Sequence, residues 1–247
     1  MSETAVTRAG GAAGKRAGTR ERILRAAAEL LAEGGREAVS TRAVAAAAGV
    51  QAPTIYRLFG DMRGLLDEVA GFGFSRYLRE KTAREIVEDP VEDLRRGWDL
   101  HVGFGLANPA FYRLMYAEPG PGAEPAAARE ANEILIGLVQ RLAEAGRLRV
   151  GVERAARMIH AAGMGVVLSL IAAKPEERNP ELSEATREAI LDAVTTDAAP
   201  DTATGQDRVS GRAVALKAVL PEASAGFTPS EGALLSEWLD RLIDKRG

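Results

Sequence analysis

Apolar residues along this 247-residue chain recur at intervals of three and four, and no run of segments alternates apolar and polar residues. The first spacing places side chains on one face of an α-helix, whereas half-buried β-strands would need alternation. Glycine, proline and capping residues interrupt the helical pattern. The pattern predicts an all-α protein with helices near residues 19–33, 42–48, 52–59, 62–88, 91–107, 109–116, 126–144, 152–173, 182–194, 214–220 and 228–245.

Two of these predicted helices are short and lie close together. Ser40 or Thr41 begins the first, Gly49 ends it, and Ala52–Pro53 opens the second, which runs to about Phe59. Two short helices joined by a tight glycine turn form a helix-turn-helix, whose second helix enters the major groove of DNA. We expect a small core of apolar residues from three helices: Ile23, Leu24, Val44, Val50, Ile55 and Phe59.

Hydroxyl and guanidinium groups near these two helices suit phosphate oxygens and base edges. For Tyr56 the alternative role is to cover the small core, and for Arg57 it is a solvated surface charge. Thr41 and Pro53 could serve only to start their helices. The predicted DNA-contacting residues are Thr41, Arg42, Gln51, Ala52, Pro53, Thr54, Tyr56, Arg57 and Arg63.

The distribution of charge supports this interpretation, although the net charge of −3 for the whole chain argues mildly against nucleic acid. Residues 1–81 hold 13 basic and 9 acidic side chains, a net charge of +4, and the rest of the chain carries −7. A basic N-terminal part and an acidic remainder are what a DNA-binding domain and a separate non-DNA-binding domain need.

The block from Thr19 to Val69 resembles the TetR family of bacterial transcriptional repressors. The resemblance rests on an opening helix, a glycine, a capped second helix and a glycine turn, followed by the recognition segment: Ile23, Ala27, Leu30, Gly35, Thr41, Arg42, Ala43, Val44, Ala48, Gly49, Val50, Thr54, Ile55, Tyr56, Arg57, Phe59, Leu65 and Leu66. Leu58 and Met62 depart from the family, which often has His and Lys there, and both positions usually face the DNA backbone. The neighbouring Arg57 and Arg63 are expected to compensate.

This resemblance implies a dimeric DNA-binding regulator, a repressor released from double-stranded operator DNA by a small-molecule effector. The expected organisation is a disordered basic leader over 1–18, a helix-turn-helix domain over 19–62, and a helical effector-binding and dimerisation domain over 63–247. A mobile loop is expected near 195–211, where Val209 is the only large apolar residue. The predicted helix from 62 to 88 joins the two domains and is the expected lever between effector and DNA.

An effector pocket needs an apolar cavity with a few polar groups. For each candidate pocket residue the alternative is an ordinary core position. His101 and His160 could also be considered as a pair of metal ligands, but a third ligand at a fixed spacing is missing. No metal and no cofactor are therefore expected. The candidate pocket residues are Trp98, His101, Phe104, Phe111, Tyr112, Met115, Tyr116, His160, Met164 and Leu168.

A homodimer is expected because two operator half-sites require two recognition helices. Residues 158–173, which contain Gly163 and Gly165, and the last helix around 238–243 are the candidate interface, and the alternative for the former is an internal core helix. The same apolar run is shorter than the roughly 20 residues of a bilayer span, so no membrane is expected. Residues 1–18 lack the apolar segment of a signal peptide, which favours the cytoplasm.

An enzyme is not expected. The chain has no cysteine, two histidines and no glycine-rich phosphate loop. The alternative that remains is a helical small-molecule-binding or interaction protein without a DNA role.

Overall fold

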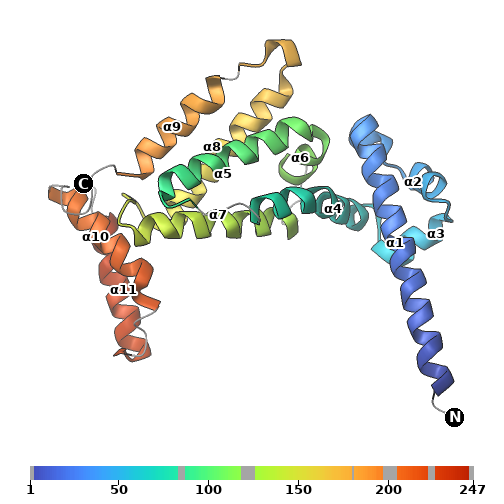
Figure 1. Cartoon of the computed structure of the whole chain (residues 1–247), viewed down its shortest axis with the longest axis horizontal. Coiled ribbons are helices and arrows are strands. Elements are labelled where there is room, and N and C mark those ends of the chain that lie inside the picture. Colours follow the sequence, from blue (N-terminus) through green and yellow to red (C-terminus); the bar gives the residue numbers. More distant parts are fainter. Residues whose placement is uncertain are drawn as a thin grey trace. The chain divides into compact units, whose positions relative to one another are not determined.

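The structure is a computed structural model that describes residues 3–82, 87–117, 126–179, 181–196, 205–221 and 226–244. In these ranges the chain forms α-helices, a short 3-10 helix at Pro175–Glu177 and no β-strand, which confirms the predicted all-α fold. The α-helices, labelled in Figure 1, are α1 (Glu3–Ala38), α2 (Thr41–Ala48), α3 (Ala52–Phe59), α4 (Met62–Thr82), α5 (Pro90–Ala107), α6 (Pro109–Tyr116), α7 (Ala126–Glu144), α8 (Val152–Ala172), α9 (Glu181–Val194), α10 (Gly205–Val219) and α11 (Pro229–Asp244).

The chain divides into two compact units. Unit 1 comprises Met1–Thr82 and Ala107–Arg129, and unit 2 comprises Ala83–Leu106 and Glu130–Gly247. Unit 1 thus contains α1 to α4 and α6, because α4 and α6 both pack against α1 and against each other. The boundary expected after residue 62 therefore falls inside this unit, and the functional division of the chain stays a prediction.

The core of unit 1 lies where α1 meets α2, α4 and α6. Ile23, Val44 and Ile55 are completely buried, and Phe59 is nearly so, as expected for the small helix-turn-helix core. Leu24 and Val50 are only half-buried, so they border that core rather than fill it.

Helix α1 differs from its expected bounds at both ends. Gly35 adopts φ 68° and ψ −167°, a left-handed φ that interrupts the helix as the glycine pair predicts. At the other end α1 already begins at Glu3, whereas the sequence predicts a disordered leader. This extension contains Gly10, Gly11, Gly14 and Gly18, which disfavour a helix, so neither local propensity nor apolar periodicity predicts it.

In unit 2, side chains of α5 contact α8 and α9. A β-carbon placed on Gly163 of α8 would lie 3.5 Å from the Trp98 ring and 3.6 Å from the His101 ring. The Trp98 indole nitrogen donates a hydrogen bond of 3.1 Å to the Ser183 hydroxyl of α9. Gly163 therefore faces inward, while Gly165 is exposed with open space around it, so only Gly165 is available to an external helix.

Ion pairs tie α5 to the helices beside it. Arg95 of α5 lies 2.9 Å from the Glu188 carboxylate of α9, and Arg187 lies 2.5 Å from Asp99. On another side of α5, Asp93 is buried and pairs with Arg141 of α7. These pairs fix the rotation of α5 within the unit.

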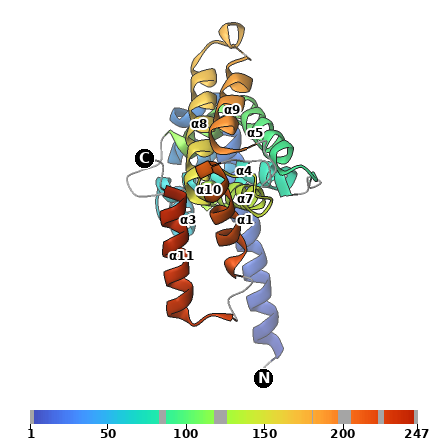
Figure 2. The ribbon, with the colours of Figure 1, turned by 90° about the vertical axis from the view of Figure 1, so that its left-hand side faces the viewer.

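Helices α10 and α11 lie side by side as an antiparallel hairpin (Figures 1 and 2). The Ser210 hydroxyl donates to the Leu242 carbonyl at 3.1 Å, and the Lys217 ammonium lies 2.5 Å from Asp240. The mobile loop expected near 195–211 is therefore wrong for 205–211, which belong to α10, where Ser210 is buried and bonded to α11. Residues 197–204 of that loop lie outside the described residues.

Among the described helices, α8 is the one long and apolar enough to span a bilayer by length and composition. Its inward face is nevertheless buried in unit 2 at Ile159, Gly163, Val166 and Leu170. That face of α8 therefore belongs to the core of unit 2, and an interface on the exposed face of the helix stays a prediction.

Candidate nucleic-acid interface

Helix α2 has a clear start and stop. The Ser40 hydroxyl accepts a hydrogen bond of 3.2 Å from the Ala43 N–H, which caps the helix. Gly49 ends it in the left-handed region, with φ 62° and ψ 41°. The following Val50 N–H then bonds to the Ala45 carbonyl at 3.0 Å, which closes the helix end and sets the turn toward α3.

Helix α3 begins directly after this turn, with Pro53 in its first turn as predicted. Ile55 and Phe59 are its buried residues, four positions apart, so one side of the helix is anchored in the core. Gln51 at its N-cap makes no side-chain capping hydrogen bond. The opposite side of α3 remains available to a partner.

The predicted DNA-contacting residues share the accessible surface of this motif. Arg42, Gln51, Pro53, Tyr56, Arg57 and Arg63 are exposed, and Thr41, Ala52 and Thr54 are half-buried. Tyr56 is 47% exposed, so a large part of its side chain is accessible to a partner. Whether these residues contact DNA stays a prediction.

One link between the two helices was not expected from the sequence. The hydroxyl oxygens of Thr41 and Tyr56 lie 3.1 Å apart, within hydrogen-bonding distance. The start of α2 and the middle of α3 therefore present two adjacent hydroxyl groups on one exposed surface. Hydroxyl groups of this kind hydrogen-bond to phosphate oxygens in protein–DNA contacts.

Sequence reasoning missed Arg20 of α1, which holds the end of α3. Its guanidinium donates a 2.9 Å hydrogen bond to the Leu58 carbonyl and stacks 4.8 Å above the centre of the Phe59 ring. The same group forms an ion pair with Glu68 of α4. Because Leu58 and Glu68 are 38 and 48 residues away along the chain, no local pattern signals the cluster.

The Glu68 carboxyl is subject to opposing effects. Desolvation raises the pKa of Glu68 above its ordinary value, although the charge of Arg20 and the hydrogen bond from it act to lower it. Through its contacts with Leu58, Phe59 and Glu68, Arg20 connects α1 with α3 and α4 near the point where α3 ends and α4 begins.

The candidate effector residues of unit 2 do not all have the same environment. Trp98 and Phe104 are buried, while His101, His160, Met164 and Leu168 are half-buried. Trp98 and His101 come together beside Gly163 of α8. His160, Met164 and Leu168 follow each other on one face of the same helix α8, as predicted from their spacing.

The remaining four effector candidates belong to α6 in unit 1. Phe111, Tyr112 and Met115 are core residues, and Tyr116 is half-buried. The Phe111 ring packs on Gly73 of α4, and the Tyr112 and Tyr116 rings lie 4.7 Å apart. The alternative of an ordinary core position thus fits Phe111, Tyr112 and Met115 well.

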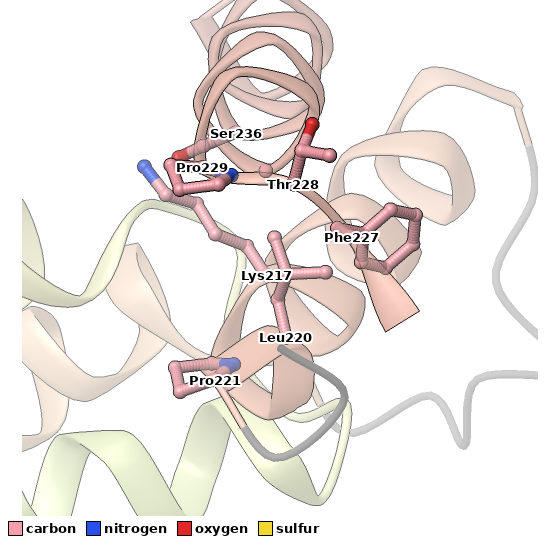
Figure 3. A pocket seen from close by; sticks show the side chains of 8 residues that line it. Lys217, Leu220, Pro221, Phe227, Thr228, Pro229 and Ser236 are labelled. Atoms are coloured by element: carbon pink, nitrogen blue, oxygen red, sulfur yellow. The ribbon is translucent and has the colours of Figure 1, made fainter. Parts of the chain in front are cut away.

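A cavity of about 420 Å³ opens at the connection between α10 and α11 (Figure 3). None of the candidate effector residues is among the described residues that line it. Lys217, the charged side chain of this lining, is paired with Asp240. The lining residues are Lys217, Leu220, Pro221, Phe227, Thr228, Pro229, Gly232 and Ser236.

A short capped helix, a glycine turn and a second helix with one buried and one exposed polar face define a helix-turn-helix DNA-binding protein. Family models support this class over most of the chain. The N-terminal model of bacterial regulatory proteins of the tetR family matches residues 23–69, and the tetracyclin repressor-like C-terminal domain matches residues 94–221. The chain belongs to the TetR family of DNA-binding transcription regulators, whose members are generally not enzymes.

Solved structures show the same fold. The TetR family regulator PfmR from Thermus thermophilus is 26% identical with a TM-score of 0.52, covering 69% of this chain and 97% of its own. NalD, the secondary repressor of the MexAB-OprM efflux pump in Pseudomonas aeruginosa, is 23% identical with a TM-score of 0.51, covering 74% and 98%.

A TetR variant from Acinetobacter baumannii, in complex with minocycline, is 22% identical with a TM-score of 0.52, covering 69% and 90%. A search of curated proteins finds no relative.

Proposed function

We propose that this protein is a dimeric repressor that binds operator DNA through α3 and leaves it when a small molecule binds unit 2. The observation that carries the DNA half is the exposed surface of α3, which presents Arg57 and Tyr56, the latter with its hydroxyl 3.1 Å from that of Thr41. Ile55 and Phe59 hold this helix in the core, so its exposed side chains are presented on a rigid element.

The proposed contacts divide by chemistry. Thr41 and Arg42 at the start of α2, and Arg63 in the first turn of α4, bind phosphates of the backbone. Tyr56 and Arg57 reach base edges and phosphates in the major groove. The start of α3 lies against the groove wall through Gln51, Ala52, Pro53 and Thr54.

The test is a gel-shift titration with a duplex that the protein selects from a random oligonucleotide pool. Arg57→Ala is expected to weaken binding about tenfold or more, because a lost arginine contact costs roughly 1–3 kcal/mol. Tyr56→Phe, which removes only the hydroxyl, is expected to weaken it less. Arg154→Ala on α8 is the matched control, since it removes an exposed arginine from unit 2.

Unchanged affinity in both Arg57→Ala and Tyr56→Ala would refute the assignment of α3 as the recognition helix. Failure to select any duplex would favour the alternative of a helical small-molecule-binding protein without a DNA role. Loss of binding in the Arg154→Ala control would instead point to a DNA contact in unit 2.

Dimerisation is proposed because the family is typically dimeric and because α8 has an exposed face of small residues. Ala161, Gly165 and Ser169 follow each other at four-residue intervals on that face. Small residues let two helices approach closely, and a dimer presents two recognition helices to two half-sites about 34–36 Å apart. The protein is proposed to act in the cytoplasm, where operator DNA is accessible.

The effector is proposed to bind near Trp98 and His101 of α5, beside Gly163 of α8. Minocycline in the structure of the Acinetobacter protein supports a small molecule as the effector class. An effector releases DNA only if it binds more tightly to the conformation that does not fit the operator, and the coupling is reciprocal.

Native mass spectrometry of the freshly purified protein identifies a retained small molecule, which is then titrated into the protein–DNA complex. The expected result is a weakening of DNA binding equal to the weakening of ligand binding by DNA. A ligand that binds without any change in DNA affinity would contradict release by that effector.

A further inference from the structure

The connection between α10 and α11 borders the cavity of about 420 Å³ shown in Figure 3. Its volume falls within the range of about 300–1,000 Å³ that small-molecule sites have. Among the described residues of its lining there is none of the effector candidates, and the part from Phe227 to Ser236 lies beyond residue 221, where the C-terminal family model ends. The cavity is therefore distinct from the proposed effector region of α5.

The wall of this cavity is mainly apolar. Leu220 and Pro221 follow the end of α10 and form one part of it, and Phe227 and Pro229, at the approach to α11, form another. Gly232 of α11 also lines the cavity, and a β-carbon placed on it would meet nothing within 4 Å. Because Gly232 has no side chain, the space beside it stays unfilled.

The charged side chain of the lining already has a partner. The Lys217 ammonium lies 2.5 Å from Asp240, which lines a second, smaller cavity of about 150 Å³ that shares Lys217 with the first. Glu153 also lines the smaller cavity. These two carboxylates thus lie at the smaller cavity, and the described lining of the larger one contains no charge without a counter-ion.

The hydroxyl groups of Thr228 and Ser236 differ in their bonding. The Thr228 hydroxyl donates to the Glu231 carboxylate at 2.7 Å and accepts from the Glu231 N–H at 3.3 Å, which caps α11. The half-buried Ser236 hydroxyl makes no hydrogen bond to the part of the chain that the structure describes. Ser236 is therefore the hydroxyl of this wall that is left for a ligand.

These features define the chemistry of the ligand. A charged molecule would lose its hydration inside an apolar wall without gaining a counter-ion, and a wholly apolar molecule would leave Ser236 without a partner. We propose that the cavity binds an uncharged, mainly apolar small molecule whose hydrogen-bonding group meets Ser236 and whose apolar body packs on Phe227. This site goes beyond the proposed function, because it is a second ligand site and does not depend on DNA binding.

Thiol protection tests the location of binding, because the natural chain has no cysteine. Gly232→Cys places a single thiol at the cavity wall, and β-naphthol, which is uncharged at neutral pH, is the probe. At about ten times its dissociation constant, the probe is expected to slow the reaction of this thiol with iodoacetamide about tenfold. Gly137→Cys on α7 is the matched control with an unchanged rate expected, since Gly137 is exposed and also has open space around it.

Analogues of the probe test its chemical class. The charged β-naphthoate and β-naphthylmethylammonium are expected to bind at least about tenfold more weakly than β-naphthol. Naphthalene, which lacks the hydroxyl, is expected to bind about fivefold more weakly. Ser236→Ala in the Gly232→Cys chain is expected to weaken β-naphthol by the same factor and to leave naphthalene unchanged, which separates the hydrogen bond from a general effect of the substitution.

Calorimetry provides a second measurement on full chains without a thiol. Gly232→Leu fills the space beside the wall and is expected to bind one molecule of β-naphthol fewer per chain than the natural protein. Gly137→Leu is the matched control and is expected to bind as the natural protein does. Thermal melting of each variant checks that the fold is kept.

Each outcome decides the proposal. Slowing confined to the Gly232→Cys thiol supports the site. Equal slowing of both thiols overturns it, and so does the absence of slowing together with equal binding by the natural and Gly232→Leu chains. Binding of β-naphthoate as tight as that of β-naphthol overturns the uncharged class. The proposed function fails instead when the natural chain selects no duplex, and that result leaves all of these measurements interpretable.

Discussion

At the scale of single residues, Arg20 of α1 holds the C-terminal end of α3, the proposed recognition helix. It lies outside the exposed surface of α3, but it bonds to the Leu58 carbonyl at the end of that helix and stacks on Phe59. Its ion pair with Glu68 extends the cluster to α4. A planar guanidinium can make these contacts at once, and a lysine ammonium cannot.

Arg20→Lys is therefore expected to weaken DNA binding about tenfold and to lower unfolding stability by about 1–2 kcal/mol, because it loses the stacking and one directed hydrogen bond. The dependence of DNA affinity on salt should keep its slope, since lysine retains the positive charge of Arg20. Gel-shift titrations at several salt concentrations measure the affinity and its slope, and urea unfolding measures the stability. Unchanged DNA affinity in Arg20→Lys would show instead that the stacking and the directed hydrogen bond of Arg20 do not affect DNA binding.

A second residue-scale prediction concerns Glu188. Hydrogen bonds from Arg95, the larger effect, and from Arg187 lower the pKa of Glu188 below its ordinary value of 4.5. Its ionised form is thus favoured in the folded state, and the stability gained is present above pH 4.5 and lost as pH falls through the lowered pKa.

Glu188→Gln is expected to be less stable than the natural chain at pH 7, by less than about 1 kcal/mol because the pair is partly solvated. This difference should shrink below pH 4.5, as the natural carboxylate takes up its proton. Urea unfolding midpoints measured from about pH 7 to about pH 3 follow it. A difference that stays constant across this range would mean that Glu188 contributes by packing and not by charge.

At the scale of helices, the local signals in the sequence predicted most boundaries well. Ser40, Gly49 and Pro53 set the ends of α2 and α3 through capping and backbone geometry, which act within a few residues. The first half of α10 was missed because its stability is not local. Ser210 is buried and its hydroxyl bonds to the Leu242 carbonyl of α11, 32 residues away along the chain, and small residues carry no apolar period.

The exposed residues of the candidate DNA surface could be predicted, because their positions follow from signals within a single helix. The contacts from other helices that hold this surface in place could not be predicted. Tyr56 and Arg57 could be placed on the exposed side of α3 from helical spacing alone. The contact of Tyr56 with Thr41 and the role of Arg20 depend on how separate helices pack. Sequence spacing within one helix contains no information about such contacts.

The crossing of α4 and α6 provides an element-scale prediction. A β-carbon on Gly73 would overlap the Phe111 ring, whereas one on Gly71 of the same helix would meet nothing within 4 Å. Gly73→Ala is therefore expected to destabilise the fold by about 1–3 kcal/mol through overpacking. Gly71→Ala, its matched control, should be neutral or up to about 1 kcal/mol more stable, because alanine favours helix.

Chemical denaturation of the two variants separates packing from helix propensity. If both variants gain stability equally, then the Phe111 ring of α6 does not lie close enough to Gly73 of α4 to clash with an added β-carbon.

At the scale of the whole molecule, charge is divided along the chain as its two proposed roles require. Residues 1–81 carry a net charge of +4 and the remainder carries −7, a contrast that the total of −3 conceals. A basic DNA-binding end attracts the duplex, and an acidic remainder avoids non-specific contact with it.

A dimer of this kind reads two half-sites on one face of the duplex. Inserting about five base pairs, half a helical turn, between the half-sites moves the second one to the opposite face. Affinity is then expected to fall at least about a hundredfold, toward the non-specific level. Fluorescence anisotropy with the natural and lengthened duplexes measures the change. Equal affinity for both would mean that a single copy carries all the binding.

The two tryptophans of this protein occupy opposite surroundings. Trp98 is buried with its indole nitrogen hydrogen-bonded to Ser183, and Trp238 is half-exposed on α11. Buried indoles emit at shorter wavelengths than hydrated ones, so the intrinsic fluorescence of the chain contains two separable signals. Replacing either one by phenylalanine leaves a single built-in optical probe. One such probe follows the proposed ligand region of α5 and the other follows the surroundings of α11, without any attached dye.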